Sequence, residues 1–362
     1  MSTILYYITG HGFGHAVRSS QVIEHLTEEY GHKVVIRTSA PRWLFTRPTH
    51  GSITFEHEEV DSGLRQNDSL TTDIAGSLEY FSWWEANLTP NVKAELENID
   101  RIMPDVIVCD IAPTGVEAGL RAGLPVVVVA NFLWDWILEG YVDESPMFAP
   151  IAKKLTSIYS KAQMILRTGL NGGMSRYENI FDIPLIARKS SGTKKEIRDD
   201  LDIAHDKIFA LISLGGHGLE RFYHDLDRRI TVAELFTIGE KADNRQKIKV
   251  FGRDAAAHED LVMASDLVIG KLGYGLCSEI ISASRGILYT PRVDFVEYNV
   301  LAKETEEYVA TIKVSQDTFL KGSLDDIIIK LLEMKPPDKT PELNGAEVAA
   351  RMIDQQYLRG RK

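Results

Sequence analysis

The sequence has only two cysteines, Cys109 and Cys277, among its 362 residues. Two cysteines this far apart in the chain suit a reducing compartment better than a disulfide-stabilised fold. The sequence also lacks an apolar run long enough to span a bilayer, and its first residues lead directly into glycines instead of resembling a signal peptide. We therefore expect a cytoplasmic protein without an integral membrane segment.

Positive charge is also scarce. The 41 lysines and arginines are outnumbered by 52 acidic residues, which gives a formal net charge of -11. Surfaces that bind nucleic acid normally carry a basic stripe, so we expect no nucleic-acid partner. No basic amphipathic helix stands out, and peripheral contact with a membrane stays open only as an alternative.

The common cofactor motifs are missing as well. No Walker loop occurs, and no C-x-x-C pair suggests a metal site, so we expect neither a metal nor another cofactor. The first glycine turn reads G-H-G-F-G-H over residues 10–15, and its third glycine comes one position too early for a dinucleotide fingerprint. The second apolar run ends in RTSA, where that fingerprint requires a carboxylate. These differences argue against NAD binding.

Short apolar runs alternate with helical patterns along the whole chain, which is typical of βαβ units around mostly parallel sheets. At 362 residues, two domains are the natural expectation. We predict two Rossmann-like α/β domains, residues 1–170 and 171–340, with a ligand in the cleft between them and a C-terminal helix and tail over 341–362. Whether that helix crosses back to the first domain is left open. The expected strands are 3–9, 32–39, 53–60, 105–110, 124–131, 162–168, one from 207, 248–252, 266–271, 286–291 and 308–314, and the expected helices include 19–30, 113–122, 275–284, 324–334 and 346–357.

The first glycine turn places an imidazole at the carboxyl edge of the predicted sheet. Imidazole is the usual general base near neutral pH, and such a base is commonly oriented by a carboxylate on its far nitrogen. Asp110 ends the strand 105–110 and should emerge at the same edge as His15, so we predict that the two pair. A helix-capping or backbone-bonding role for His15 is the alternative. His11, Gly12 and Gly14 are assigned to the same site, on the side that would contact an acceptor, meaning the molecule that gives up its proton to His15.

A second glycine turn, "IGKLGYG" over residues 269–275, has the same strand-turn-helix pattern. A helix N-terminus attracts anions, and the adjacent lysine suits a diphosphate. The glutamate within the following helix could accept a hydrogen bond from a ribose hydroxyl, and acidic residues after the next strand could hold sugar hydroxyls. Each glycine alone could also be an ordinary tight turn or helix cap. The expected donor-binding residues are Ser213, Gly215, Gly216, Lys271, Gly273, Gly275, Glu279, Asp294 and Glu297.

Two aromatic clusters, "EYFSWWE" over 79–85 and "NFLWDWI" over 131–137, are candidates for the wall of an acceptor site. Aromatic faces pack well on sugar rings and apolar ligands, and Trp134 and Trp136 are the residues we assign to this role. Plain core packing is the alternative, because helix-spaced aromatics usually point inward.

Several of these segments resemble glycosyltransferases of the GT-B fold, and in particular the glycosyltransferase-like N-terminal region of plant L-arabinokinases. The resemblance extends over about residues 3–335. The sequence has no segment that corresponds to the galactokinase-like half of those proteins, so the resemblance gives no reason to expect sugar phosphorylation. The segments that carry it are "TGHGFGHAVR", "DSGLRQNDSLTTD", "ANFLWDWILEGYV", "DIPLIARKSSGTKKEIRDDLDI" and "IGKLGYGLCSEII".

The resemblance implies a function and assigns roles to residues. Inverting members of the wider family place a base histidine after the first strand and orient it with an aspartate, and His15 and Asp110 match these positions. Lys271 stands where the family has a histidine in the donor half, and Glu279 matches a glutamate that follows eight residues later. The resemblance implies transfer of a sugar from a nucleotide sugar, expected to be UDP-linked, to an acceptor hydroxyl with inversion and without a metal. A nucleotide-sugar hydrolase or epimerase and a non-catalytic nucleotide-sugar sensor are the alternatives.

Overall fold

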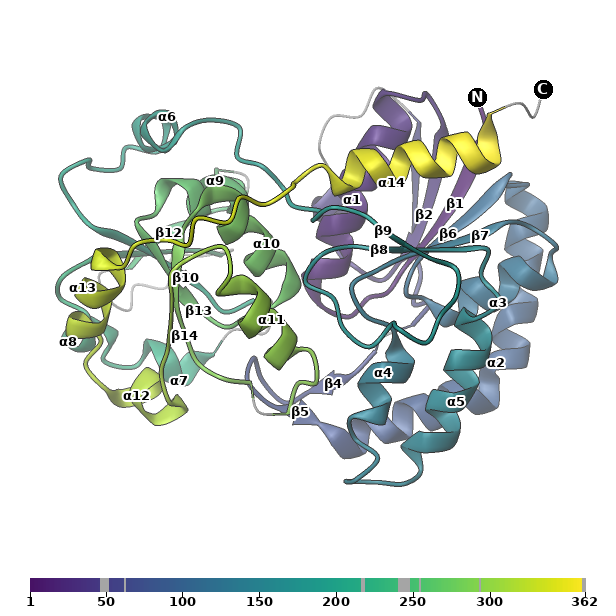
Figure 1. Ribbon diagram of the computed structural model, residues 1–362, viewed down its shortest axis with the longest axis horizontal. Helices are drawn as coiled ribbons and strands as arrows, with labels where there is room; N and C mark the ends of the chain where they lie inside the picture. The colour runs from purple at the N-terminus through teal and green to yellow at the C-terminus, as the bar shows by residue number, and fades with distance from the viewer. Residues whose placement is uncertain are drawn as a thin grey trace. The chain divides into compact units, whose positions relative to one another are not determined.

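The structure is a computed structural model that describes residues 1–45, 52–61, 63–215, 219–239, 248–253, 255–292 and 294–359 (Figure 1). The chain divides into a first unit of residues 1–66, 72–186 and 342–362 and a second unit of residues 67–71 and 187–341. The boundary after residue 186 comes later than the expected boundary at residue 170. The reason is that strand β9 still pairs with β8, and Ile183 and Ile186 pack in the core of the first unit.

The first unit is built on a seven-stranded sheet with the order β3-β2-β1-β6-β7-β8-β9, in which all pairs are parallel, as predicted. Central strands such as β7, with the sequence VVVVA, are buried along their whole length because helices cover both faces of a parallel sheet. The strands are β1 (Thr3–Ile8), β2 (Lys33–Thr38), β3 (Ile53–His57), β6 (Val106–Asp110), β7 (Val126–Ala130), β8 (Met164–Arg167) and β9 (Ile180–Asp182), and the separate hairpin is β4 (Arg65–Gln66) and β5 (Thr72–Asp73).

The C-terminal helix α14 belongs to the first unit, so the chain does cross back to it. Ala346, Ala349 and Ile353 of α14 lie in the same core as Ile23 and Leu26 of α1, and α14 crosses in front of α1 in Figure 1. The helices of this unit are α1 (Gly12–Glu28), η1 (Arg42–Phe45), α2 (Ile74–Ile102), α3 (Pro113–Arg121), α4 (Trp134–Glu139), α5 (Phe148–Tyr159), α14 (Gly345–Ile353) and the π-helix η2 (Asp354–Leu358).

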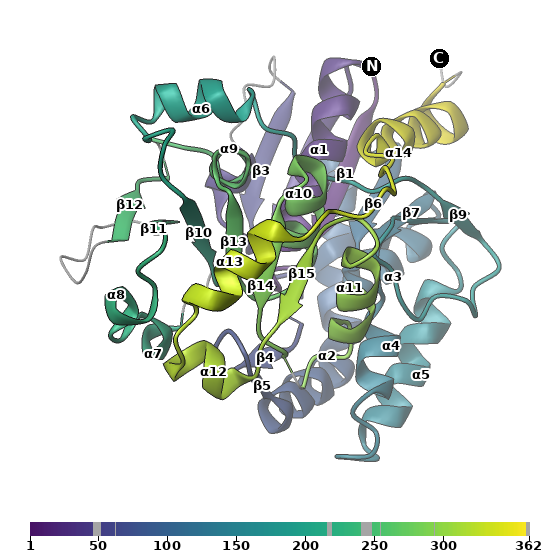
Figure 2. The same ribbon diagram turned by 60° about the vertical axis from the view of Figure 1, so that its left-hand side comes forward.

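The second unit contains a six-stranded parallel sheet with the order β12-β11-β10-β13-β14-β15. Helix α13 packs across β13, β14 and β15, where Ile328 and Leu331 enter the core (Figure 2). The strands are β10 (Phe209–Ser213), β11 (Glu234–Ile238), β12 (Ile248–Phe251), β13 (Leu267–Gly270), β14 (Gly286–Tyr289) and β15 (Thr311–Lys313). The helices are α6 (Lys194–Asp200), α7 (Glu220–Tyr223), α8 (Leu226–Arg229), α9 (His258–Ala264), α10 (Tyr274–Ala283), α11 (Tyr298–Thr305), α12 (Gln316–Lys321) and α13 (Asp325–Glu333).

Each sheet has one point at which the strand order reverses. In the first sheet this point lies between β1 and β6, where Ile8 is opposite Asp110. In the second sheet it lies between β10 and β13, where Ser213 is opposite Gly270. Open parallel sheets bind ligands beyond the carboxyl ends of the strands at such switch points. The residues that follow these four strands are therefore the first place to look for function.

Candidate active site

Helix α1 begins at Gly12, directly after β1, and not near Ser19 as the sequence pattern suggested. Gly12 has a φ of +66°, which is a conformation that other residues rarely adopt, so glycine lets the chain turn sharply from strand into helix. His15 consequently lies in the first turns of α1 and not in a loop. Because the N-cap position belongs to His11, which makes no side-chain cap hydrogen bond, helix capping does not explain His15.

His15 and Asp110 are in contact at the switch point of the first sheet. His15 Nδ1 lies 2.8 Å from Asp110 Oδ1, and Asp110 is completely buried while His15 is 5% exposed. Ser19 donates a hydrogen bond to Asp110 Oδ2 at 2.8 Å. Burial opposes ionisation of Asp110, but Arg18 and His15 outweigh it and hold the pKa of Asp110 below its usual value. Asp110 is therefore a carboxylate at neutral pH and can orient the imidazole.

Arg18 is a member of this cluster that the sequence analysis did not identify. It is 1% exposed and donates to both oxygens of Asp110, through Nε at 2.7 Å and Nη2 at 2.6 Å. Its Nη1 donates to Asn131 Oδ1. The buried negative charge of Asp110 is thus already compensated by a guanidinium, and the carboxylate contacts His15, Arg18 and Ser19 at once.

The same arginine lies close to the histidine ring. Arg18 Nη2 is 2.8 Å from His15 Nδ1, the nitrogen that also faces Asp110. Because arginine only donates and aspartate only accepts, the proton on Nδ1 decides which contact is a hydrogen bond. With the proton on Nδ1, His15 donates to Asp110 and Nε2 is the basic nitrogen. A general base at this position requires that tautomer.

Trp134 supports the histidine and does not line an open site. It is completely buried, with its ring centroid 5.2 Å from that of His11 and 6.3 Å from that of His15. Its Nε1 donates to Asp61 Oδ2 at 3.0 Å. The acceptor contact that we assigned to Trp134 is therefore corrected: full burial leaves this side chain no surface for a ligand.

Asp61, which the sequence analysis did not assign, is a buried carboxyl beside this cluster. It is 2% exposed, and burial raises the pKa of Asp61 to about 7, with a further contribution from the charge of Asp110 and opposition from the hydrogen bonds of Thr9 and Trp134. Its backbone oxygen also accepts from Gly10 N at 3.2 Å. Asp61 thereby holds the glycine turn and Trp134 in place.

The remaining acceptor-side predictions have mixed outcomes. His11, Gly12 and Gly14 have accessible surface at the start of α1, and His11 Nε2 lies 3.4 Å from Gln66 Nε2. Trp136 is half-buried against Gly172 and Gly173. The aromatic cluster at 79–85 lies in α2, where Trp84 is 1% exposed and Trp83 is 54% exposed. Core packing therefore accounts for part of both aromatic clusters.

The switch point of the second sheet presents an open helix N-terminus. Helix α10 begins at Tyr274, its N-cap Gly273 makes no side-chain hydrogen bond, and its first turn contains no acidic residue. Space is open where a side chain on Gly273 would be. The first backbone N–H groups of a helix carry partial positive charge and attract anions. Gly275 lies in this first turn, as predicted.

Lys271 and Gly215 meet beside this helix. Gly215 has a φ of +76°, and a Cβ atom on it would lie 3.3 Å from Lys271 Nζ, so the end of the lysine side chain lies against Gly215. Burial and the neighbouring Arg292 lower the pKa of Lys271 to about 7, while Glu297 acts in the opposite direction. Among the described residues, no carboxylate lies within ion-pair distance of Lys271. This combination favours an anion as the missing partner.

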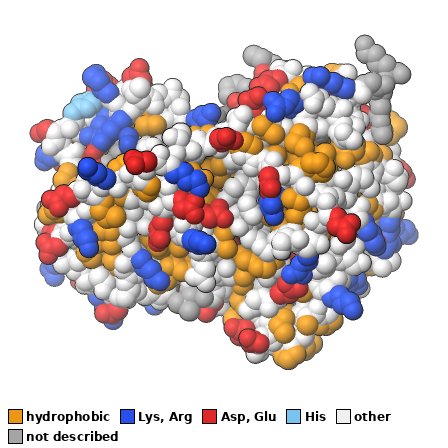
Figure 3. All heavy atoms as spheres, in the orientation of Figure 1, with side chains coloured by type: hydrophobic (Ala, Val, Ile, Leu, Met, Phe, Trp, Pro, Cys, Tyr) orange, Lys and Arg blue, Asp and Glu red, His pale blue; other side chains and the backbone are white. Residues whose placement is uncertain are grey.

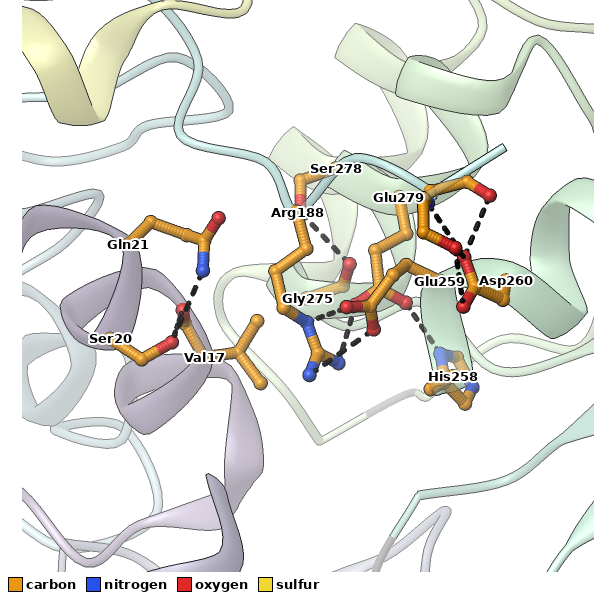
Figure 4. A network of polar contacts seen from close by, with 12 residues as sticks. Val17, Ser20, Gln21, Arg188, His258, Glu259, Asp260, Gly275, Ser278 and Glu279 are labelled. Carbon is orange, nitrogen blue, oxygen red and sulfur yellow. Dashed lines mark hydrogen bonds and ion pairs between the residues drawn. The ribbon is translucent and has the colours of Figure 1, made fainter. Parts of the chain in front are cut away.

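Glu279 is already fully engaged by protein groups. It is 2% exposed, and Arg188 donates to its Oε1 through Nε at 2.9 Å and Nη2 at 2.7 Å. His258 Nδ1 lies 2.5 Å from its Oε2, and Figure 4 shows Arg188 and His258 on two sides of the carboxylate. Burial leaves Glu279 almost no surface for the predicted contact with a ribose hydroxyl. Neither Arg188 nor His258 was identified from the sequence.

The other donor-side residues lie near the same switch point or outside the described part of the chain. Ser213 ends β10, and its Oγ lies 3.0 Å from His258 Nε2. Asp294 and Glu297 are half-buried in the segment that leads into α11, and Glu297 is the N-cap residue of that helix. Gly216 lies outside the described residues.

The surface shows no preference for one charge over the visible face. Acidic and basic side chains are interspersed on each unit in the view of Figure 3. Along the described part of the chain, we find no helix with the length and apolar character needed to cross a bilayer.

Comparison with solved structures identifies the fold. The calicheamicin glycosyltransferase CalG4 superimposes with a TM-score of 0.67 and 13% sequence identity, covering 100% of both chains. The chain has the GT-B fold. MurG of Acinetobacter baumannii matches with a TM-score of 0.56 and 13% identity over 98% of this chain and 99% of the other. A UDP-glucosyltransferase from Polygonum tinctorium matches with a TM-score of 0.62 and 12% identity over 99% and 93% of the two chains.

Sequence comparisons agree with this GT-B assignment and confirm the resemblance that we noted. Residues 2–153 match the family model described as Glycosyl transferase family 1. The chain is 29% identical over 360 residues to the L-arabinokinase of Arabidopsis thaliana. This alignment covers 98% of the chain and 34% of the relative, so the chain spans about a third of that protein's length. Together these matches support sugar transfer as the class of activity.

Proposed function

We propose that this GT-B protein transfers a sugar from a nucleotide sugar, UDP-linked, to an acceptor hydroxyl with inversion at the anomeric carbon. The observation that carries the proposal is the contact between His15 and Asp110 at the switch point of the first sheet. A second switch point with an open helix N-terminus and Lys271 supports the donor half of the proposal. The reaction requires both groups of residues to act on the same pair of substrates.

In this mechanism, His15 removes the proton of the acceptor hydroxyl. The hydroxyl oxygen attacks the anomeric carbon, the bond between that carbon and the diphosphate oxygen breaks, and the proton passes to His15 Nε2. Asp110 keeps the imidazole in the required tautomer by accepting from Nδ1. The nucleoside diphosphate leaves with the bonding electrons.

The leaving diphosphate is stabilised by groups of the second unit. The N-terminus of α10 and the ammonium of Lys271 offer positive charge beside Gly215 and Gly273. Preorganised charge of this kind stabilises the developing negative charge without a metal. Asp294 and Glu297 are our candidates for holding hydroxyls of the transferred sugar.

A screen of nucleotide sugars by thermal unfolding tests donor binding first. A ligand present at 100 times its dissociation constant stabilises the folded state by about 2.7 kcal/mol, which is readily detected. We expect UDP and at least one UDP-sugar to raise the unfolding temperature, and a K271M variant to reduce that rise. If no nucleoside diphosphate or nucleotide sugar stabilises the protein, the proposed function is wrong.

Product analysis then separates the transferase from its two rivals. With the donor identified, a transferase forms a glycoside only when an acceptor is present and inverts the anomeric configuration. Release of free sugar without an acceptor would favour a hydrolase. Tight binding of UDP with no turnover across a broad set of acceptors would favour a sensor.

The pKa of Lys271 gives a separate prediction about the donor site. We expect a lysine signal that titrates near pH 7 in NMR spectra of the protein with ¹³C-labelled lysine, because burial and Arg292 lower the pKa of Lys271 to about 7. UDP should shift this midpoint upward, since an anion favours the charged ammonium.

The K271R variant assigns the signal and serves as its control. The near-neutral titration should vanish in K271R, and the signals of the other lysines should be unchanged by the substitution. A spectrum in which every lysine titrates above pH 9 would contradict the prediction.

A further inference from the structure

A chain of hydrogen bonds links the donor edge of the second sheet to a buried carboxylate. Ser213 Oγ lies 3.0 Å from His258 Nε2, and His258 Nδ1 lies 2.5 Å from Glu279 Oε2. Arg188 occupies Glu279 Oε1. The serine ends β10 at the switch point, the histidine begins α9, and the glutamate lies in α10. Figure 4 shows the buried end of this chain.

The ionised glutamate determines which way these hydrogen bonds run. Burial alone would raise the pKa of Glu279, but the guanidinium of Arg188 and the hydrogen bond from His258 hold it below its usual value, so the group is a carboxylate and can only accept. His258 must therefore carry a proton on Nδ1. In a neutral imidazole the other nitrogen, Nε2, then has a lone pair, so it accepts the hydroxyl hydrogen of Ser213.

A hydrogen bond from the Ser213 hydroxyl to His258 makes the binding of a phosphate next to Ser213 unfavourable. With its hydrogen donated to His258, the hydroxyl presents only lone pairs to a ligand, and phosphate oxygens are themselves acceptors. A protonated His258 reverses the arrangement, because Nε2–H then donates to Ser213 Oγ. The hydroxyl hydrogen is released and can be donated to the phosphate in a hydrogen bond of the strong, charge-assisted kind.

We infer that His258 sets the direction of the Ser213 hydroxyl, and that a diphosphate bound beside Ser213 takes up a proton at His258. The inference rests on the proposed function, which places the diphosphate of the donor at this edge. His258 is a positioning residue: it acts on the ligand through Ser213. The result is a donor site whose affinity depends on the proton occupancy of a histidine that the ligand does not touch.

The charges around His258 allow it to become positive. From α10 it faces Glu279, and within α9 it is followed by Glu259 and Asp260. Arg188 is the cation that bridges Glu279 and Glu259, with Nη1 3.3 Å from Glu259 Oε2. Two carboxylates thus contact one guanidinium, and the charge of Asp260 adds to theirs, so the negative charge here exceeds the positive charge and a second cation is favoured.

The other elements that pack near His258 add little to the balance of charge around it. From α6, Arg198 reaches the far end of α9 at the Ala264 oxygen and pairs with Asp266. From β10, Ser213 is the contact of His258. Lys271 lies beside Gly215, and it would exchange a proton of its own when an anion binds. The experiment must therefore separate the lysine from the histidine.

Calorimetric titration with UDP at pH 8 measures the proton uptake directly. The heat of binding is compared in two buffers with different ionisation enthalpies, and the K271R background removes the contribution of the lysine. The terminal phosphate, with a pKa of about 6, is fully ionised at this pH. We expect uptake of up to about one proton with His258 present, and about none in H258Q, whose amide N–H can donate to Ser213 at any pH.

Two further variants define what each outcome means. S213A should also lose the proton uptake and bind UDP about tenfold more weakly, which is the scale of one hydrogen bond to a charged group. H205Q is the matched control, since His205 Nε2 lies 2.7 Å from Asp199 Oδ1 at an exposed position of the same unit, and it should change nothing.

The failures of the two proposals are distinguishable. UDP binding with the same proton uptake in H258Q as in its parent overturns the role of His258 and leaves the proposed function standing. Absence of UDP binding by the wild-type protein overturns the proposed function and this inference with it. If the K271R substitution itself abolishes UDP binding, H258Q is compared with the wild-type protein instead. The difference in proton uptake between these two proteins at pH 8 then decides the role of His258.

Discussion

Replacement of His15 by alanine is expected to lower kcat by about 10²–10⁴, which is the usual contribution of a general base. This factor corresponds to about 3–5 kcal/mol of the activation free energy. Arg18 Nη2 lies 2.8 Å from His15 Nδ1, and its positive charge opposes the imidazolium that forms when the acceptor proton is taken. We therefore expect the loss to fall toward the lower end of that range. Steady-state kinetics with the donor and acceptor found by screening measure it.

The affinity for UDP should change little in H15A, because the proposed donor residues lie in the second unit. H25A is the matched control: His25 is in the same helix and pairs with Glu29 at 2.6 Å, but its side chain is only half-buried. It should retain wild-type kcat. If H15A turns over within about threefold of the wild type, His15 is not the base.

Replacement of Asp110 by asparagine is expected to destabilise the protein by about 3–5 kcal/mol. The substitution leaves the guanidinium of Arg18, which is 1% exposed, without the carboxylate that compensates its charge. Removing one partner of a buried ion pair costs this much because the remaining charge is still desolvated. Urea unfolding at pH 7 measures the change in the free energy of unfolding. Activity should also fall, because asparagine cannot hold His15 in the same way.

The control is D182N, which removes the partner of Arg167 in the same unit. Arg167 Nε donates to Asp182 Oδ1 at 2.6 Å, but the aspartate side chain is 69% exposed, so we expect a loss of about 0–1 kcal/mol. A loss of less than 1 kcal/mol in D110N as well would show that the Arg18 pair adds no more than an exposed one.

The pH dependence of the Asp110 contribution has a definite sign. The pKa of Asp110 is lower in the folded state than the ordinary 3.8, so the stabilisation is fully present above that value and is lost as the pH falls through the folded pKa. The difference in unfolding free energy between wild type and D110N should therefore be constant from pH 7 to 5. It should shrink below about pH 4, where the carboxyl begins to bind a proton.

Part of the site could be predicted because parallel strands bring their carboxyl ends to one edge. His15 follows β1 and Asp110 ends β6, and this was sufficient to expect their pairing. The strand order that makes β1 and β6 neighbours is a tertiary property, and the sequence alone supplied no measure of it. The GT-B fold was predictable for a similar reason, since alternating strands and helices allow few arrangements other than parallel sheets.

Arg18 was missed because of a helix boundary. It is three residues after His15, a spacing that places two side chains on the same face of a helix. The expected start of the helix near Ser19 left both residues in a loop, where this spacing has no meaning. The positive φ of Gly12 starts the helix earlier and brings Arg18 onto Asp110. The seven residues between the expected and the observed start of this helix are a larger difference than the fraying of a helix end.

By itself, the sequence determined the two Rossmann-like units, the parallel sheets and the glycine turns that mark their ligand edges, because backbone periodicity and glycine chemistry are local properties. The tertiary structure decided which side chains contact one another in the site. It buried Trp134, enclosed Glu279 between Arg188 and His258, and placed Arg18 and His15 on one carboxylate. Such contacts join residues from different elements, and they depend on strand order and helix packing that no short stretch of sequence contains.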